Sequence, residues 1–442
     1  MTSETRIRYG IMWAAIILCQ LLSPYSHADP YHYVNMLVSE RSSGLGGAYT
    51  AIADDPAGLY YNPAGIVYSY GTKLSASMNT YYKEQKHYDN VLGDNGWDRT
   101  CSALLPNFFG IVQPFSQGRV GFSYAVADAM IEDQDQQFAD LELNLISGID
   151  PNRKVLSDCV LNYNNEDHTY NVGPSYAWKI NKSFSLGTTL YIHHRKNQWI
   201  LNQVFNFQEG DNRHLQQTTY YEIKEWGIKP LVGCIWSPER GKMSVGLTLS
   251  HTFIFDSMER QQQSTCGSDN IETWTSKELR DPNDPQYYPY STNILSVSEK
   301  KEYPYIITLG AAYFPNHSLL FSGDIAYYTA TDGSVMHKRR RAVTNFSFGT
   351  EYYWKESIAL RVGAFTDFAN TYEIERGKEN QSEHINMYGG SMNISYLARR
   401  TSLTVGIVYK YGSGEAQVQG GYNVQKVTTS SIMGYVGSSY SF

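Results

Sequence analysis

Apolar residues recur at every second position in many separate stretches of this chain. In the stretch 184–192, Phe184, Leu186, Leu190 and Ile192 share one face of an extended backbone, and small or polar residues occupy the other face. A period of two predicts β-strands with one apolar and one polar face. The pattern predicts fourteen strands, at 73–83, 106–114, 119–128, 166–179, 184–196, 219–236, 242–255, 302–314, 319–329, 342–354, 357–369, 384–397, 401–411 and 429–442.

The connections between these strands alternate between short and long. Short polar turns are predicted at 115–118, 180–183, 237–241, 315–318, 355–356 and 398–400, and long connections at 84–105, 129–165, 197–218, 256–301, 330–341, 370–383 and 412–428. Outer-membrane barrels have short turns on one side and longer loops on the other. The alternative is a soluble array of β-sandwiches, but Gly, Ser and Thr on the predicted inner face would make a poor dry core. We therefore predict an all-β fold, a 14-stranded antiparallel transmembrane β-barrel.

The first residues have the layout of a secretory signal peptide. Arg6 and Arg8 precede an apolar run at 11–22, and the small residues Ser26 and Ala28 occupy the −3 and −1 positions of a cleavage site after Ala28. This run is too short to cross the membrane as a helix, because spanning takes about 20 residues. We expect residues 1–28 to be removed and the chain to be exported to the bacterial outer membrane.

Composition and cysteine spacing exclude several classes of protein. The formal net charge is −7, which argues against a nucleic-acid partner. Export leaves Cys101, Cys159, Cys234 and Cys266, which contain no C-x-x-C pair, so no metal site or cofactor is expected. Three of these cysteines lie in predicted loops, so one loop-to-loop disulfide is plausible, without a pairing that can be deduced. No G-x-S-x-G or H-E-x-x-H motif occurs, and no enzymatic activity is expected.

Residues 29–70 do not alternate, and we expect them to fold inside the barrel as a hatch, or plug, with the barrel formed by residues 71–442. The region contains the run G-L-G-G-A-Y-T-A-I-A-D-D-P-A-G-L-Y-Y-N-P-A-G at 44–65. This run closely resembles the N-terminal hatch of the FadL/TodX family of outer-membrane transporters for hydrophobic compounds. The residues that carry the resemblance, and that we assign to the hatch and its gating, are Gly44, Gly46, Gly47, Asn62, Pro63 and Ala64.

The resemblance implies a monomeric barrel for the passive uptake of long-chain fatty acids or other hydrophobic molecules. In that family, outer loops capture the substrate, a pocket above the hatch binds it, and it leaves sideways at a kink in the third strand. The inward residues of the corresponding strand here are Gly121, Ser123 and Ala125, all of them small. The implied partners are the hydrophobic small molecule and the lipid and lipopolysaccharide of the outer membrane. The last strand ends in Phe442, which resembles the signal read by the barrel assembly machinery.

Two groups of residues are candidates for substrate contact. A fatty-acid carboxylate needs a cation, and the alternation directs Arg361 inward beside Phe365, with Lys229 also inward. An inward Arg is ordinarily paired with a lumen acid such as Glu225 or Glu351, so a ligand role competes with a structural one. Candidate loop residues for the apolar tail are Leu141, Leu143 and Leu145, in a stretch at 138–146 that could be a short amphipathic helix or simply pack the loop.

Three functions remain open at this point. The first is the uptake of hydrophobic substrates, either fatty acids or aromatic compounds. The second is an open porin for polar solutes, which the expected hatch argues against. The third is an adhesin or receptor, favoured by the long connection 256–301.

Overall fold

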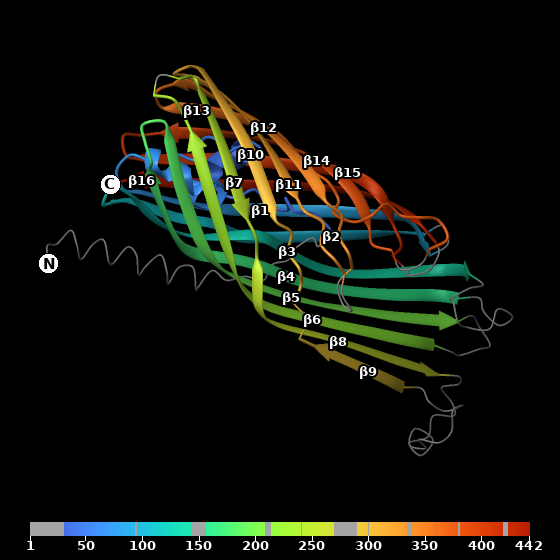
Figure 1. The fold of residues 1–442 in the computed structure, drawn as a ribbon. Helices are drawn as coiled ribbons and strands as arrows, with labels where there is room; N and C mark the ends of the chain where they lie inside the picture. Colours follow the sequence, from blue (N-terminus) through green and yellow to red (C-terminus); the bar gives the residue numbers. More distant parts are fainter. Residues whose placement is uncertain are drawn as a thin grey trace, which may run out of the picture.

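The chain forms an antiparallel β-barrel in which one group of neighbouring strands extends far beyond the rest of the wall (Figure 1). This computed structural model describes residues 31–92, 95–143, 156–207, 214–239, 241–268, 290–298, 300–333, 338–378, 381–418 and 423–442. The expected signal peptide, residues 1–28, lies outside these ranges. None of the helices in the described part of the chain is long and apolar enough to cross a membrane.

Sixteen strands form one sheet within the described residues. They are β1 (Lys73–Leu92), β2 (Asn95–Phe115), β3 (Gly118–Leu143), β4 (Leu156–Lys179), β5 (Phe184–Phe207), β6 (His214–Trp236), β7 (Met243–Ser250), β8 (Phe253–Ser268), β9 (Tyr290–Val297), β10 (Ile306–Asn316), β11 (Leu319–Tyr328), β12 (Val343–Lys355), β13 (Ile358–Asp367), β14 (His384–Leu397), β15 (Thr401–Ala416) and β16 (Gln425–Ser441).

The barrel closes on itself as a ring of fourteen positions. Strand β1 pairs with both β2 and β16, and β5 pairs with both β4 and β6, so the ring has no open end. Strands β7 and β8 are two parts of one position, because both pair with β6, at Leu231–Trp236 and at His214–Ile228. Strand β9 pairs with β8 outside the ring. The predicted 14-stranded antiparallel barrel is therefore confirmed as a fold.

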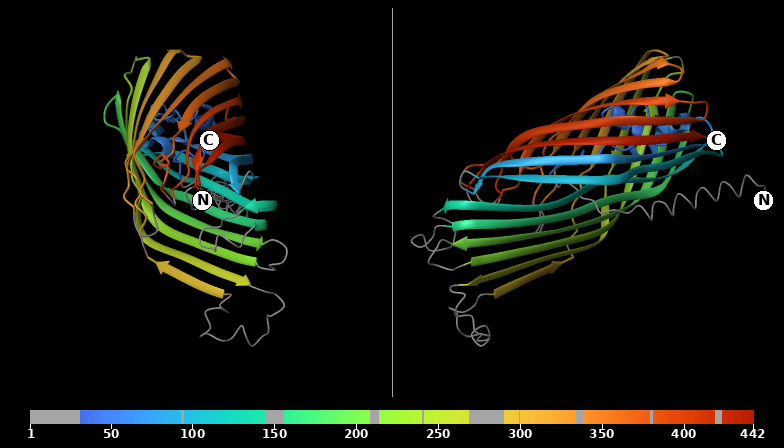
Figure 2. Two further views of the ribbon diagram at one scale, coloured as in Figure 1. Left: turned by 90° about the vertical axis from the view of Figure 1, so that its right-hand side faces the viewer. Right: turned by 180° about the vertical axis from the view of Figure 1, so that it is seen from behind.

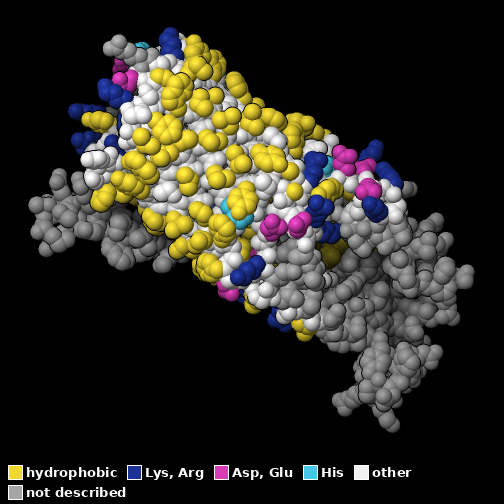
Figure 3. All heavy atoms as spheres, in the orientation of Figure 1, with side chains coloured by type: hydrophobic (Ala, Val, Ile, Leu, Met, Phe, Trp, Pro, Cys, Tyr) yellow, Lys and Arg dark blue, Asp and Glu magenta, His cyan; other side chains and the backbone are white. Residues whose placement is uncertain are grey.

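Side chains alternate between the two faces of the wall as the period of two requires. On β13 the outward Val362 is 53% exposed and the neighbouring inward Arg361 is 4% exposed. Large apolar side chains cover the outer surface of the barrel as a broad band (Figure 3). Charged and amide side chains point inward, where they bind one another and the N-terminal residues.

Several predicted long loops are wrong, because the strands continue through them. The expected loop at 84–105 is a hairpin of β1 and β2, and the loops at 129–165 and 197–218 belong largely to β3 to β6. Strands β3 and β4 have 26 and 24 residues, whereas about 9–11 residues suffice to span a membrane. Figure 2 shows these strands, with β5, β6, β8 and β9, projecting as an extended sheet beyond the other strands. The single strand expected at 242–255 is broken between β7 and β8.

Candidate functional site

Residues 31–70, called here the N-terminal segment, lie inside the barrel near the end that carries the short turns (Figure 1). The segment contains α2 (Glu40–Gly44), α3 (Gly58–Tyr61) and the 3₁₀-helix η1 (Pro63–Tyr68). Wall side chains from many strands bind its backbone. The Asp324 carboxylate accepts the N–H groups of Tyr49 and Thr50, both at 2.9 Å, and Asn393 donates to the Glu40 carbonyl at 2.7 Å. These helices are too short to be stable alone, so contacts with the wall stabilise them.

At eight further contact positions the wall carries glycine, so that the N-terminal segment meets its backbone. A Cβ added at any of eight wall glycines would lie 2.1–2.8 Å from an atom of the segment, closer than real Cβ contacts occur. These residues, called here the glycine belt, are Gly121, Gly187, Gly233, Gly246, Gly310, Gly349, Gly363 and Gly437. They come from β3, β5, β6, β7, β10, β12, β13 and β16, which surround the segment. The segment therefore packs directly on wall backbone around the barrel.

The residues predicted for the hatch contribute to this packing. Gly46 and Gly47 have φ of +65° and +85°, in the left-handed region that favours glycine, and a Cβ at Gly46 would lie 3.0 Å from the backbone of Ala364. Gly44 ends α2 with the Asn393 amide against it. The predicted residues Pro63 and Ala64 are buried in the first turn of η1.

Asn62 connects the segment to the barrel wall. Its Nδ2 donates to the carbonyls of Thr50 at 2.8 Å and Cys234 at 3.1 Å, and its Oδ1 accepts the Ala64 N–H at 3.1 Å. Cys234 belongs to β6, so this side chain joins two turns of the segment to the wall. An amide is required here, because both a donor and an acceptor are used.

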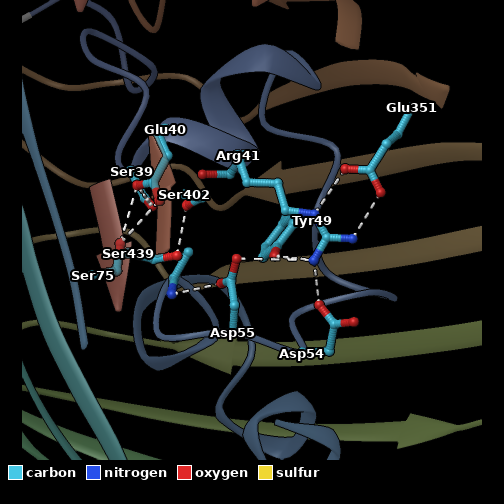
Figure 4. Close-up of polar contacts among 12 residues, drawn as sticks. Ser39, Glu40, Arg41, Tyr49, Asp54, Asp55, Ser75, Glu351, Ser402 and Ser439 are labelled. Atoms are coloured by element: carbon cyan, nitrogen blue, oxygen red, sulfur yellow. Dashed lines mark hydrogen bonds and ion pairs between the residues drawn. The ribbon is translucent and has the colours of Figure 1, made fainter. Parts of the chain in front are cut away.

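An ionic network holds the underside of the segment (Figure 4). Arg41 donates to both oxygens of Glu351, from Nε at 2.9 Å and Nη2 at 3.0 Å, and its Nη1 lies 2.5 Å from Asp54. Arg361 also donates to Glu351, at 2.5 Å, and to Ser395 at 2.5 Å. Arg361 is therefore paired with a lumen acid, which the sequence analysis gave as the alternative to ligand binding. It lines a cavity of about 140 Å³ at the short-turn end, and not the larger cavities on the other side of the segment.

A second cavity, called here the inner cavity, lies on the long-strand side of the segment. Its volume is about 290 Å³, and Phe365 and Lys229 from the predicted set both line it. Tyrosines form much of the remaining wall: Tyr33, Tyr60, Tyr61, Tyr191, Tyr303 and Tyr328. The residues that the sequence grouped around Arg361 are thus divided between two sides of the N-terminal segment.

Two ammonium groups in the inner cavity form no ion pair with the described part of the chain, although Glu225 and Asp167 lie close enough to Lys301 to stabilise its charge. Lys229 Nζ lies 5.6 Å above the Tyr60 ring, and Lys301 Nζ lies 4.7 Å above the Tyr303 ring. Neither amine makes a hydrogen bond or an ion pair with a residue that the structure describes. Arg195, in the same cavity, is instead paired with Asp167 at 2.5 Å. The sequence analysis missed Lys301, because it lies in the connection before β10 where no alternation indicates its direction.

An outer cavity of about 710 Å³ lies farther from the short-turn end than the inner cavity, among the extended strands. The two cavities share Arg195, Lys301, Glu302, Thr331 and Arg340 as lining residues. They therefore meet, and Lys301 is placed where they join. Among the described residues, no group of three or more His, Cys, Asp or Glu side chains is placed to hold a metal ion.

The barrel wall is interrupted between β2 and β3. These strands pair from Phe108–Phe115 with Gly118–Ala125 and again at Cys101 with Glu132, but no ladder joins residues 102–107 to residues 126–131. We call this stretch the β2–β3 gap. The register with β4 also shifts between Val126 and Asp128. Ala127 and Asp128 line the inner cavity, so the cavity reaches the wall at the gap.

The N-terminal segment contacts both strands at the β2–β3 gap: Asn107 of β2 donates to the Leu37 carbonyl at 3.1 Å, and Asn35 donates to Asp128 of β3 at 2.8 Å. Met36 and Leu37 of the N-terminal segment pack in one cluster with Val126, Ala129 and Met130 of β3. Side-chain packing can rearrange more readily than a continuous ladder. The gap is therefore a part of the wall that the N-terminal segment itself helps to close.

The residues predicted for a lateral opening lie just before the gap. Gly121, Ser123 and Ala125 are in the paired part of β3, at the level of the N-terminal segment. Gly121 packs on Leu59, and Ser123 shares a 2.8 Å hydrogen bond with Tyr191. The interruption therefore lies outside 121–125, in the next residues of β3.

Other predicted residues have different outcomes. The helix considered at 138–146 does not form at residues 138–143, because β3 continues to Leu143. Residues 144–146 lie outside the described residues. Leu141 and Leu143 lie in this strand with side chains outside the description, and Leu145 lies outside the described residues. Cys101, Cys159 and Cys234 are free, and all lie in strands, whereas the Cys266 side chain is not described.

The C-terminal Phe442 follows β16, at the same end of the barrel as the start of β1. Its N–H donates to the Thr72 carbonyl at 2.9 Å. Backbone hydrogen bonds between the last and first parts of the barrel therefore continue to Phe442.

Comparison with known proteins shows the fold. No family model matches the sequence, and no curated protein matches it significantly. Among solved structures, a FadL homologue from Pseudomonas aeruginosa has a TM-score of 0.59 and 14% identity, covering 94% of this chain and 100% of that one. The toluene transporter TodX from Pseudomonas putida has a TM-score of 0.61 and 13% identity, covering 92% and 99%. The toluene transporter TbuX from Ralstonia pickettii has a TM-score of 0.56 and 13% identity, covering 92% and 99%. The resemblance seen at residues 44–65 thus extends to the fold of nearly the whole chain, which is that of the FadL and TodX barrels.

Proposed function

We propose that this protein is an outer-membrane channel for the passive uptake of hydrophobic molecules, with long-chain fatty acids as the substrate class. The apolar outer surface suits a barrel in lipid, where only helices and closed barrels satisfy their backbone. The predicted signal peptide at 1–28 supplies export. In this proposal residues 29–70 are the hatch and residues 71–442 the barrel, and the protein acts as a monomer.

The observation that carries the proposal is the pair of ammonium groups in the inner cavity that form no ion pair with a described residue. A buried charge without a partner is costly, and a carboxylate that pairs with it recovers that cost. Lys229 and Lys301 offer such a site, and Phe365, Leu231 and the tyrosines offer apolar surface to the tail. Each methylene that leaves water contributes about 0.8 kcal/mol. The inner cavity therefore suits an amphiphile with an anionic head.

The arrangement of cavities suggests a route. Substrate enters the outer cavity, passes Lys301 into the inner cavity, and leaves through the β2–β3 gap into lipid. The N-terminal segment blocks the direct path below, because the glycine belt surrounds it. Exit requires movement of Met36 and Leu37, which pack against β3 at the gap. This gives the N-terminal segment a gating role.

Binding of paired ligands tests the proposal. We expect Lys229→Met and Lys301→Met each to weaken oleate binding by about tenfold or more, since a hydrogen bond to a charged group contributes about 1.5–3 kcal/mol. Binding of oleyl alcohol, which lacks the carboxylate, should change little. Lys224→Met is the matched control, because Lys224 lies on the same strand with an exposed side chain that pairs with Glu222. Equal oleate affinity in all variants would contradict the proposal.

Aromatic hydrocarbons are a second candidate substrate class. The six tyrosines of the inner cavity favour them, because aromatic rings pack well edge-to-face or offset. TodX and TbuX are described as toluene transporters, and a further similar structure as a monoaromatic hydrocarbon channel. Toluene carries no charge, so its uptake should not depend on Lys229 or Lys301. Toluene uptake that is unchanged in these variants, together with absent oleate uptake in wild type, would favour this class.

A further inference from the structure

A row of aromatic rings crosses the extended sheet on the face toward the outer cavity. Tyr163 of β4, Trp199 of β5 and Tyr221 of β6 are neighbours in space, with ring centroids 6.3 Å and 5.4 Å apart. All three are partly exposed and line the outer cavity. We call these three residues the aromatic row. At its far side Trp97 contacts Tyr163, with centroids 6.3 Å apart, and is itself buried.

The aromatic row lies at one level, beyond the part of the strands that spans a membrane. Tyr163 is 16 positions from the short-turn end of β4 at Lys179, Trp199 is 15 from Phe184, and Tyr221 is 15 from Trp236. About 9–11 residues of a tilted strand are enough to cross the hydrocarbon. The row therefore stands outside the hydrocarbon, at the level where membrane sugars are found.

Near the aromatic row lie polar side-chain groups that form no hydrogen bond within the part of the chain that the structure describes. The side-chain amides of Gln203 and Gln261 line the outer cavity and make no hydrogen bond with a described residue. Trp97 Nε1 and Arg99 Nε are buried with no hydrogen-bond partner in the described ranges, and both residues line the same cavity. Buried donors are normally satisfied, so these two donors and the two amides make this part of the outer cavity polar as well as aromatic.

The combination is poorly matched to a purely apolar resident ligand, as distinct from a substrate that only passes through the cavity. A hydrocarbon tail or toluene over this wall would leave the two amides and the two buried donors unsatisfied, each at a cost. A pyranose ring matches both features, because its C–H groups carry partial positive charge that suits the negative face of an aromatic ring. Its hydroxyl groups both donate and accept, as the amides require.

We propose that the outer cavity is a saccharide-binding site, in which the aromatic row stacks against pyranose rings and Gln203, Gln261 and Trp97 bind their hydroxyl groups. The residues of this site line the outer cavity only, beyond the part where it meets the inner cavity, and sugar binding there does not depend on uptake of a hydrophobic substrate. The saccharide could be a soluble oligosaccharide or the sugar portion of lipopolysaccharide, which share this chemistry. A sugar bound here would hold the extended sheet within the polysaccharide layer.

Titration of the full-length protein in detergent tests the site. The probes are maltohexaose and the core oligosaccharide released from lipopolysaccharide, with binding followed by calorimetry. We expect at least one probe to bind, and Trp199→Leu to weaken that binding by about tenfold. Binding of the core oligosaccharide alone would assign the site to lipopolysaccharide, and binding of both would assign it to pyranose chains in general.

A matched variant separates the site from a general loss of structure. Trp226 lies on β6 with an outward side chain that is 43% exposed, away from the outer cavity. Trp226→Leu should leave the affinity within twofold of wild type, and Gln261→Leu should weaken it. The proposal is overturned if neither probe binds, or if Trp199→Leu and Trp226→Leu bind a probe equally well. Oleate uptake, measured in parallel, reports on the proposed channel function and not on this site.

Discussion

Adding one methyl group to the glycine belt should loosen the N-terminal segment. A Cβ at Gly363 would lie 2.1 Å from the backbone nitrogen of Gly46 and 2.3 Å from the carbonyl carbon of Leu45. Both are backbone atoms of the segment, so no flexible side chain can turn away. In Gly363→Ala, either the wall or the segment must move.

The contact distances set the size of the effect. Overpacking a well-packed interior typically costs about 1–3 kcal/mol. Because the added carbon meets backbone well inside contact distance, we expect about 3 kcal/mol, at the upper end. Each 1.4 kcal/mol is a factor of ten, so the population with a displaced segment should rise about a hundredfold.

Conductance across a planar lipid bilayer measures this displacement. Wild-type protein with its segment in place should conduct little, and Gly363→Ala should show frequent open events. Gly390→Ala is the control, because the nearest atom to a Cβ there is 3.8 Å away, which is ordinary contact. Both proteins should first be shown to form folded barrels in equal yield. Equal conductance of Gly363→Ala and Gly390→Ala would refute the idea that the belt holds a plug.

Three further predictions concern the segment and the inner cavity. Asn62→Ala removes the hydrogen bonds to Thr50, Cys234 and Ala64, and should lower uptake of labelled oleate at normal surface abundance; unchanged uptake would count against gating by the segment. Glu351→Gln removes the carboxylate that Arg41 and Arg361 share; Arg41 keeps Asp54, but Arg361 loses its ion pair, and the protein should be destabilised by about 3–5 kcal/mol in thermal unfolding, whereas Glu356→Gln in an exposed turn should have no effect. Burial lowers the pKa of Lys301 to about 8, so its charge is lost as pH rises through that value; oleate should bind less tightly at pH 9 than at pH 7, and a pH-independent affinity would exclude Lys301 from the site.

The strands could be predicted because an apolar outer face and a polar inner face place different side chains at alternate positions of the wall. Val362 and Arg361 alternate for this reason, and the stretch 357–369 was found from sequence. The same rule fails in the extended parts of the long strands, where polar residues occupy both faces. Strand β4 at 162–165 reads Asn-Tyr-Asn-Asn, and β3 at 134–137 reads Gln-Asp-Gln-Gln, so these segments resembled loops.

The site could be predicted only in part, because its geometry depends on contacts between distant parts of the chain. Alternation shows that Arg361 points inward, but not that Arg41 lies beside it and shares Glu351. Gly363 and Gly46 were each visible as glycines, but their contact depends on how the N-terminal segment lies in the barrel. The position of Lys301 depends on the path of the connection before β10, and the β2–β3 gap depends on which residues of two strands pair. No local sequence pattern predicts either of them. The plugging role of residues 29–70 stays a prediction.

Native mass spectrometry of the protein extracted from the outer membrane tests the central claim most directly. The account predicts a bound amphiphile with the mass of a fatty acid, retained by wild type and by Lys224→Met. The double variant Lys229→Met/Lys301→Met should lose it while remaining a folded barrel. A wild-type protein without a bound acid, or a double variant that retains the acid fully, would contradict the account.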